Sequence, residues 1–299
     1  MERFVDLGGR RLRMVCLGEG EPTVILEAGM GQPLETWRLV QPAMAEWARV
    51  VSYDRAGVGQ SDPGPTPRSC LDIVSDLQAL LEGARIPPPY VLVGHSLGGL
   101  VVRAHAQRFP EDVVGMVLVD APHPAYPARA LELLPPEATG ECAEVTESRR
   151  TFARMVQGTD GPDGPEAVAW GASLAQVLAA GPLGEKPLVV VSAGKPGDFA
   201  PDFPADLAVE ITALVRECQR DLVRLSPKGK HLVAEASGHF VQLDQPELVV
   251  DAVRTVVEAV RNLRGPATIT SVNGGGDTWR HAAPAVRRSD VSAVLRHAR

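Results

Sequence analysis

The sequence has few cysteines, and they form no pattern that binds a metal. Its 299 residues include only four cysteines, which lie far apart: Cys16, Cys70, Cys142 and Cys218. The absence of a C-x-x-C pair argues against a zinc site and against a redox dithiol. A chain of this length can bury a large core without disulfides. We therefore expect buried or half-buried thiols in a reducing compartment, and neither a metal nor a cofactor.

Long apolar runs and an excess of positive charge are also missing. No stretch approaches the ~18 apolar residues of a membrane-spanning helix, and the chain does not begin with an apolar leader. The net charge is −7 with scattered basic residues, which argues against nucleic acid or an anionic membrane surface as the main partner. We expect a soluble, cytoplasmic protein without a membrane span. Its oligomeric state cannot be read from these features.

What the sequence does contain is a short apolar run that stops at a glycine turn. Residues 90–100 read YVLVGHSLGGL and include the pattern G-x-S-x-G, a candidate nucleophile elbow. The flanking glycines allow a turn so tight that the hydroxyl of Ser96 stands clear of the strand end. Apolar residues then recur at helical spacing, so strand, turn and helix follow in the order that the motif requires. We predict that Ser96 is a nucleophile rather than only a helix cap.

Strand and helix patterns alternate along most of the chain, which predicts an α/β fold. Strands are predicted at residues 4–7, 11–17, 23–27, 49–53, 90–93, 113–119, 187–193 and 230–236. Helices are predicted at residues 37–47, 70–83, 97–109, 205–225 and 244–263. On the second helix, Asp72, Asp76 and Glu82 are expected to face water. The last helix is expected to open with a capping box at Asp244.

Two segments depart from this alternation. Residues 123–185 show helical periodicity in short pieces and no strand, which predicts an insertion of helices over the sheet. Residues 265–299 are basic and have little apolar periodicity, so a poorly ordered tail is predicted there. The predicted organisation is thus a core of residues 1–122 and 186–264, a helical cap of residues 123–185, and the tail.

A serine hydroxyl needs a base to take its proton as it attacks, and histidine has a suitable pKa. His95 adjoins Ser96 but points to the other side of the turn, His105 lies within a helix, and His231 begins a strand. His239 lies on a loop between the last strand and the last helix, at the same edge of a parallel sheet as the elbow. We predict that His239 is the base.

Four separated motifs together resemble the α/β-hydrolase superfamily. They are the glycine loop at 27–31, DRAGVGQS at 54–61, the elbow at 94–99, and SGHF at 237–240. The resemblance covers residues 4–264 and is strongest to proline-iminopeptidase-like and esterase-like members with a helical cap. It implies the α/β-hydrolase fold, a mostly parallel eight-stranded sheet flanked by helices. Dehalogenases and epoxide hydrolases of this superfamily use an aspartate nucleophile, which is replaced here by Ser96.

The resemblance also implies where the remaining catalytic groups lie. It places the oxyanion hole on the backbone N–H groups of Leu97 and Met30. The histidine that often precedes the glycine of this loop is Ala28 here. The triad acid is either Asp120 or Asp198, and most relatives resemble the Asp198 arrangement. We favour Asp120, because it directly follows the predicted buried strand 113–119, where an aspartate without a partner would be costly.

The expected activity is that of a serine hydrolase that cleaves carboxylic esters through an acyl-enzyme. An acyltransferase or perhydrolase, a lyase, and a non-catalytic protein that binds a small ligand remain as alternatives. Apolar residues of the insertion either bind a small or medium apolar acyl group or fasten the cap to the sheet: Phe152, Met155, Trp170, Leu174 and Leu178. Asp54 and Arg55 are expected to be a structural pair, and His123 is expected in a plain loop.

Overall fold

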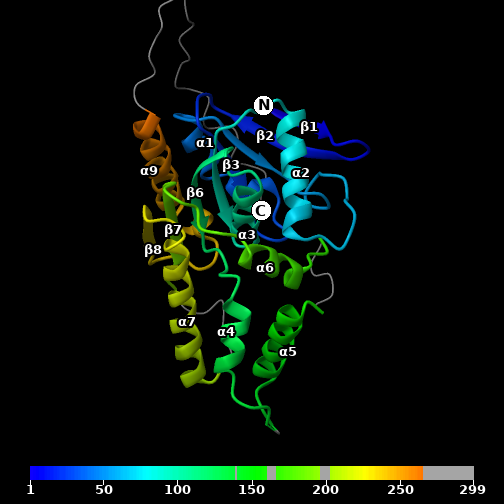
Figure 1. Ribbon diagram of the computed structural model, residues 1–299, viewed down its shortest axis with the longest axis vertical. Coiled ribbons are helices and arrows are strands. Elements are labelled where there is room, and N and C mark those ends of the chain that lie inside the picture. Colours follow the sequence, from blue (N-terminus) through cyan, green and yellow to red (C-terminus); the bar gives the residue numbers. More distant parts are fainter. Residues whose placement is uncertain (139, 160–165, 196–202, 265–299) are drawn as a thin grey trace, which may run out of the picture. The chain divides into compact units, whose positions relative to one another are not determined.

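An eight-stranded sheet forms the centre of the computed structural model, which describes residues 1–138, 140–159, 166–195 and 203–264 (Figure 1). The strands are β1 (Glu2–Asp6), β2 (Arg11–Leu17), β3 (Thr23–Glu27), β4 (Val50–Tyr53), β5 (Tyr90–His95), β6 (Val113–Val119), β7 (Leu188–Ala193) and β8 (Gly229–Ala234). Their order is β1-β2-β4-β3-β5-β6-β7-β8. β2 is antiparallel to both β1 and β4, and the other neighbours are parallel. The predicted fold class, a mostly parallel eight-stranded sheet, is confirmed.

Helices cover both faces of this sheet, which is why its central strands are apolar at nearly every position. Along β6, Met116 and Leu118 enter one apolar cluster, and Val117 and Val119 enter another on the opposite face. The first cluster includes side chains of α2 (Cys70–Gly83), α3 (Leu97–Arg108) and α7 (Ala205–Val223). The second includes side chains of η1 (Leu34–Trp37), α1 (Gln41–Ala45) and α9 (Pro246–Arg264).

The described residues between β6 and β7 form three helices: α4 (Tyr126–Leu133), α5 (Ala143–Gln157) and α6 (Trp170–Leu178). α4 and α5 pack with α7 around a separate apolar cluster that includes Ala130, Val145 and Ile211. α6 instead packs against α2 and α3 (Figure 1). The division into core and cap remains a prediction, and the predicted tail at residues 265–299 lies outside the described residues.

Some details of the predicted elements differ in the structure. The helix expected at 37–47 is divided into η1 and α1, since Pro42 has no N–H to donate and stands in the first turn of α1. The last predicted helix corresponds to α9 but begins two residues later, at Pro246, and the short helix α8 (Val241–Asp244) precedes it. Asp76 does not face water: it is buried and pairs with Arg10 and Arg68.

Within the residues described, no helix is both long and apolar enough to cross a membrane. Cys70 and Cys218 are buried, and Cys16 and Cys142 are half-buried, as expected for thiols that fill space in a core.

A glycine in the first turn of α3 allows this helix to approach the end of β3. A Cβ atom on Gly98 would lie 2.3 Å from the backbone oxygen of Glu27 and 2.7 Å from that of Ala28. Both obstacles are main-chain atoms, so a side chain here would displace either the helix or the strand end.

We therefore expect Gly98→Ala to lower the free energy of unfolding by about 1–3 kcal/mol through overpacking. The gain of about 1 kcal/mol that alanine brings inside a helix does not offset this clash. Gly181→Ala is the matched control, because a Cβ atom there would meet nothing within 4 Å. Denaturant unfolding of both variants measures the difference, and equal stability would contradict the proposed contact.

Candidate functional site

The residues predicted to be functional gather at one edge of the sheet, where the parallel strands end. Met30 follows β3, Ser96 follows β5, and Asp120 follows β6. His239 lies after β8, on the loop that leads into α8. We call this edge the carboxyl edge. Side chains from strands far apart in the sequence meet here, as is usual in open parallel sheets.

Ser96 lies at the sharp turn between β5 and α3. Its backbone has φ 51° and ψ −123°, and such a positive φ is unfavourable for a residue with a side chain. Its hydroxyl makes no capping hydrogen bond to α3, so a role as helix cap is not supported. A Cβ atom on Gly94 would lie 2.4 Å from the backbone oxygen of Gly98, which explains why the first position of the motif is glycine.

The structure brings Asp120 and His239 together. The Nδ1 atom of His239 lies 2.7 Å from Oδ2 of Asp120, whose side chain is almost fully buried. The other carboxylate oxygen accepts the N–H of Ala193 at 2.9 Å, and the N–H of Asp120 donates to Val191 at 2.7 Å. Asp120 also has a positive φ of 41°. The hydrogen bond from Ala193, the last residue of β7, therefore fixes the direction of the Asp120 carboxylate. The alternative acid, Asp198, lies outside the described residues.

The loop that carries His239 is held by polar contacts of its own. Oδ2 of Asp244 accepts hydrogen bonds from the Ser237 hydroxyl at 3.1 Å and from the Gly238 N–H at 3.2 Å. Asp244 was predicted to cap the last helix, but its carboxylate braces this loop. The carbonyl oxygen of His239 lies 2.8 Å from Nε2 of His95.

The other histidines considered as bases make different contacts. His95 is fully buried behind the elbow, and His105 is fully buried within α3. His231 on β8 lies 2.8 Å from the Ser192 hydroxyl. His123 is half-buried in the loop after β6, and burial lowers its pKa to about 4.

The predicted oxyanion donors lie on the two segments that Gly98 brings together. Leu97 is the first residue of α3, and Met30 lies in the loop after β3. Among the hydrogen bonds of the described residues, neither of these backbone N–H groups is a donor. The next N–H of the loop, that of Gly31, is already occupied by Glu166 at 2.6 Å.

A buried arginine holds the Met30 loop in place. The guanidinium of Arg55 donates to the carbonyl oxygens of Ala28 and Gly29, each at 2.6 Å. It also contacts two buried carboxylates, Glu27 at 2.6 Å and Glu166 at 2.5 Å and 2.7 Å. Arg55 therefore connects β3, β4 and the segment before α6.

The predicted pairing of Asp54 with Arg55 is wrong. The Oδ1 atom of Asp54 accepts the N–H of Leu34 at 2.7 Å, and its Oδ2 atom lies 3.4 Å from Arg13. The partners of Arg55 are distant in sequence. Glu166 in particular was missed, because its only sequence signal is a single carboxylate ahead of a short apolar run.

Burial and the arginine act in opposite directions on the two carboxylates. Burial favours the protonated form of Glu166, but hydrogen bonds and charge from Arg55, with the Gly31 N–H, outweigh it and lower its pKa. Burial prevails at Glu27 and raises its pKa, although Arg55 and Tyr53 oppose the change. Glu166 is therefore the carboxylate whose ionised form the fold favours.

The apolar residues of the insertion mostly serve packing. Met155, Trp170 and Leu174 belong to the apolar cluster that α6 forms with α2 and α3. Phe152 packs edge-on against Tyr126, with ring centroids 5.5 Å apart, and Leu178 is exposed. Fastening the helices is thus the role that these contacts support.

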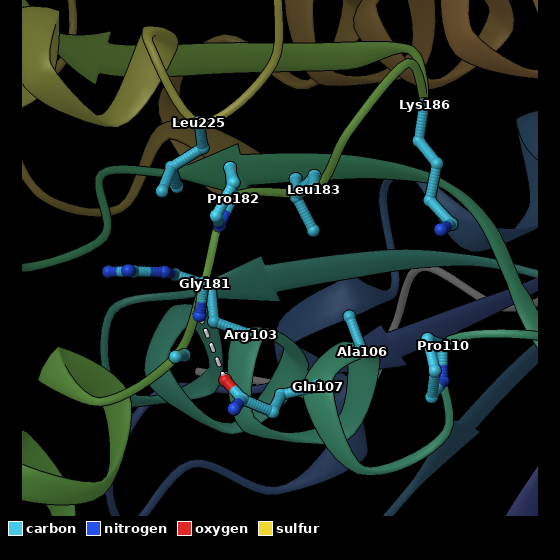
Figure 2. Close-up of a pocket in the computed structure, with 10 residues that line it drawn as sticks. Arg103, Ala106, Gln107, Pro110, Gly181, Pro182, Leu183, Lys186 and Leu225 are labelled. Carbon is cyan, nitrogen blue, oxygen red and sulfur yellow. Dashed lines mark hydrogen bonds between the residues drawn. The ribbon is translucent and has the colours of Figure 1, made fainter.

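A separate cavity of about 210 Å³ lies between α3 and the segment that precedes β7 (Figure 2). Its lining includes Arg103, Gln107 and Lys186, and the Gly181 N–H donates to Gln107 at 3.1 Å. Burial lowers the pKa of Arg103 to about 10. Figure 2 shows its guanidinium directed past Gly181 and away from Lys186, so the two cations do not converge on one ligand.

Among the described residues, no cluster of side chains is arranged to hold a metal ion.

Comparison with known proteins supports the fold. Residues 24–252 match the alpha/beta hydrolase family. The uncharacterized protein YqjL of Bacillus subtilis is 28% identical over 249 residues, which are 80% of this chain and 85% of YqjL. An AB hydrolase superfamily protein of Gibberella zeae is 26% identical over 282 residues, 81% of this chain and 88% of that protein. A solved structure of a thermophilic esterase from Thermogutta terrifontis superposes with a TM-score of 0.59 at 20% identity, covering 87% of this chain and 99% of the esterase.

The ion pair between Arg55 and Glu166 predicts a pH-dependent loss of stability in Glu166→Gln. At neutral pH the variant leaves Arg55 buried with one carboxylate fewer, and we expect a loss of up to about 3–5 kcal/mol. Because the pKa of Glu166 is lowered in the folded state, its contribution is present above the unfolded value of 4.5 and is lost as the pH falls through the lowered value. The difference from the wild type should therefore shrink in acid.

The matched control is Glu147→Gln. Oε1 of Glu147 lies 3.4 Å from a guanidinium nitrogen of Arg154, and both side chains of this ion pair are exposed. Exposed pairs contribute only about 0–1 kcal/mol. Denaturant unfolding between neutral and acidic pH tests both variants. A Glu166→Gln effect as small as the control, or one that grows in acid, would contradict the role assigned to this carboxylate.

Proposed function

Because the chain belongs to the alpha/beta hydrolase family, we propose that it is a serine hydrolase that cleaves carboxylic esters. The observation that carries this proposal is the 2.7 Å contact between His239 and Asp120, at the same sheet edge as Ser96. Ser96 and Asp120 both have positive φ angles, and such strain often persists at sites where function requires the geometry.

In the proposed reaction, Asp120 accepts a hydrogen bond from Nδ1–H of His239, which leaves Nε2 as the basic nitrogen. Nε2 takes the proton of the Ser96 hydroxyl as Oγ attacks the ester carbonyl carbon. The oxyanion that forms is stabilised by the N–H groups of Met30 and Leu97, each worth about 3–4 kcal/mol. His239 then protonates the leaving alkoxide, and an acyl-enzyme remains on Ser96.

A water molecule completes the cycle. His239 takes a proton from this water, which attacks the acyl carbon and forms a second tetrahedral intermediate. Collapse of that intermediate releases the carboxylic acid and returns the proton to Ser96. The substrates proposed are esters with small or medium apolar acyl groups, and a series of acyl chain lengths tests this preference.

Three other functions use the same fold, and each has a distinguishing observation. An acyltransferase or perhydrolase would pass the acyl group to an added alcohol or peroxide, so product analysis with competing acceptors separates it from a hydrolase. A lyase would use Ser96 and His239 as acid and base and would form no acyl-enzyme. A protein that only binds a small ligand would show no turnover of any ester.

We expect Ser96→Ala to lower kcat for p-nitrophenyl esters by about 10⁵–10⁶-fold, since the nucleophile is lost while binding groups remain. The fold should be unchanged, because the hydroxyl makes no capping bond. Initial rates over a series of acyl chain lengths, together with the melting temperature, measure both effects. Substantial turnover by a folded Ser96→Ala variant would remove Ser96 from the mechanism.

The acid is tested by a pair of aspartate variants. Asp120→Asn should cut kcat by about 10⁴-fold, because an amide can hold His239 in the wrong tautomer. Asp198→Asn should have little effect on kcat. Melting temperatures of both variants show whether stability has changed as well. An active Asp120→Asn beside an inactive Asp198→Asn would transfer the role of acid to Asp198.

A further inference from the structure

His95, the residue before the proposed nucleophile, contacts both of the other loops that form the site. It is fully buried at the end of β5, with Nε2 2.8 Å from the carbonyl oxygen of His239. Its Nδ1 lies 3.2 Å from the side-chain oxygen Oε1 of Gln32, in the loop that carries Met30. The rings of His95 and His239 also pack together, with centroids 4.7 Å apart.

The contact with the Met30 loop is close along the backbone as well. A Cβ atom on Gly29 would lie 2.9 Å from Nδ1 of His95, so the loop rests against the imidazole at a residue without a side chain. The N–H of Gln32 donates to the carbonyl oxygen of Gly29 at 3.2 Å, which closes the turn around Met30. The ring of His95 therefore lies between the oxyanion loop and the His239 loop.

The chemistry of these contacts fixes the protonation of His95. Burial, together with the charge of His239, lowers the pKa of His95 to about 3, so its imidazole is neutral near pH 7. A neutral imidazole carries one N–H, and the His239 carbonyl can only accept. The proton is therefore on Nε2, whose N–H donates to the carbonyl oxygen of His239, and the unprotonated Nδ1 faces Oε1 of Gln32.

His239 is thus held at two points: Asp120 contacts its ring, and His95 contacts its backbone. We propose that His95 is a positioning residue that sets the His239 loop and the Met30 loop in register with Ser96. This inference rests on the proposed function, because it assigns to His95 the alignment of that reaction's base and oxyanion hole. His95 takes no proton from the substrate and is not a catalytic residue.

His105 shows what a histidine that only fills space looks like in this protein. It is also fully buried, and burial lowers its pKa to about 4. Neither of its ring nitrogens has a hydrogen-bond partner among the described residues, and its ring packs against Tyr90 and Phe109. His95 differs in that both of its ring nitrogens lie beside polar groups, and both of these groups belong to loops of the site.

The test compares His95→Phe, which keeps an aromatic ring but removes both nitrogens, with His105→Phe as the matched control. A misplacement of about 1 Å can cost about 10²-fold in rate, so we expect His95→Phe to lower kcat by about 10²-fold with KM nearly unchanged. His95→Gln should recover part of this loss, because its amide N–H can still reach the His239 carbonyl. His105→Phe should leave kcat within a few-fold of the wild type.

A second readout does not depend on ester turnover. The proton between His239 and Asp120 should give a low-field NMR resonance that is identified by its loss in Asp120→Asn. We expect this resonance to broaden or disappear in His95→Phe and to persist in His105→Phe. If the wild type cleaves no ester, the proposed function fails, while the resonance still reports whether His95 positions His239.

Two results would overturn the inference. One is a folded His95→Phe variant with wild-type kcat and an unchanged resonance. The other is a loss of kcat that is equal in His95→Phe and His105→Phe and follows their melting temperatures, which would show a structural role alone. If His95→Phe does not fold, His95→Asn takes its place, since its shorter amide cannot reach the His239 carbonyl. Wild-type kcat in that variant would equally overturn the inference.

Discussion

The close contact between the first turn of α3 and the neighbouring strand ends is the constraint on which the carboxyl edge depends. A Cβ atom on Gly98 would meet the backbone of β3, and one on Gly99 would lie 2.3 Å from the Cβ of Ala121. Both contacts require glycine, and together they fix the start of α3 between the residues that follow β3 and β6. The positive φ of Ser96 follows from this placement, because the chain must turn sharply to leave β5 and enter the helix.

Around this contact, charged and polar side chains hold the loops that carry Met30 and His239. Arg55 binds the Met30 loop through two carbonyl oxygens and ties it to Glu27 and Glu166. Burying a guanidinium is costly unless its charge is paired and its N–H groups are used, and Arg55 meets both conditions. His95 also contacts the Met30 loop, and it lies between this loop and His239. The loops of the proposed site are therefore set by contacts between residues distant in sequence.

This difference between local and distant contacts explains what could be predicted from the sequence. The helix at 70–83 and the strand at 113–119 match α2 and β6 in full, because periodicity and a buried apolar run are local signals. Asp120 was favoured as the partner of His239 because it directly follows a predicted buried strand, and the structure places the two side chains in contact. Helical periodicity placed Asp76 on the exposed face of its helix. It could not show that Arg10, from another part of the chain, pairs with Asp76 in a buried position. Glu166 was missed for the same reason.

The central claim is that Ser96 is a nucleophile activated by His239, and covalent labelling tests it most directly. The protein would be treated with a fluorophosphonate, and the modified peptide and the labelling rate would be measured by mass spectrometry. We predict a single adduct on Ser96, formed at least 10²-fold more slowly in His239→Ala, because general-base catalysis typically contributes about 10²–10⁴-fold. Labelling of a different serine, or ester turnover by a protein that is not labelled at Ser96, would contradict the account.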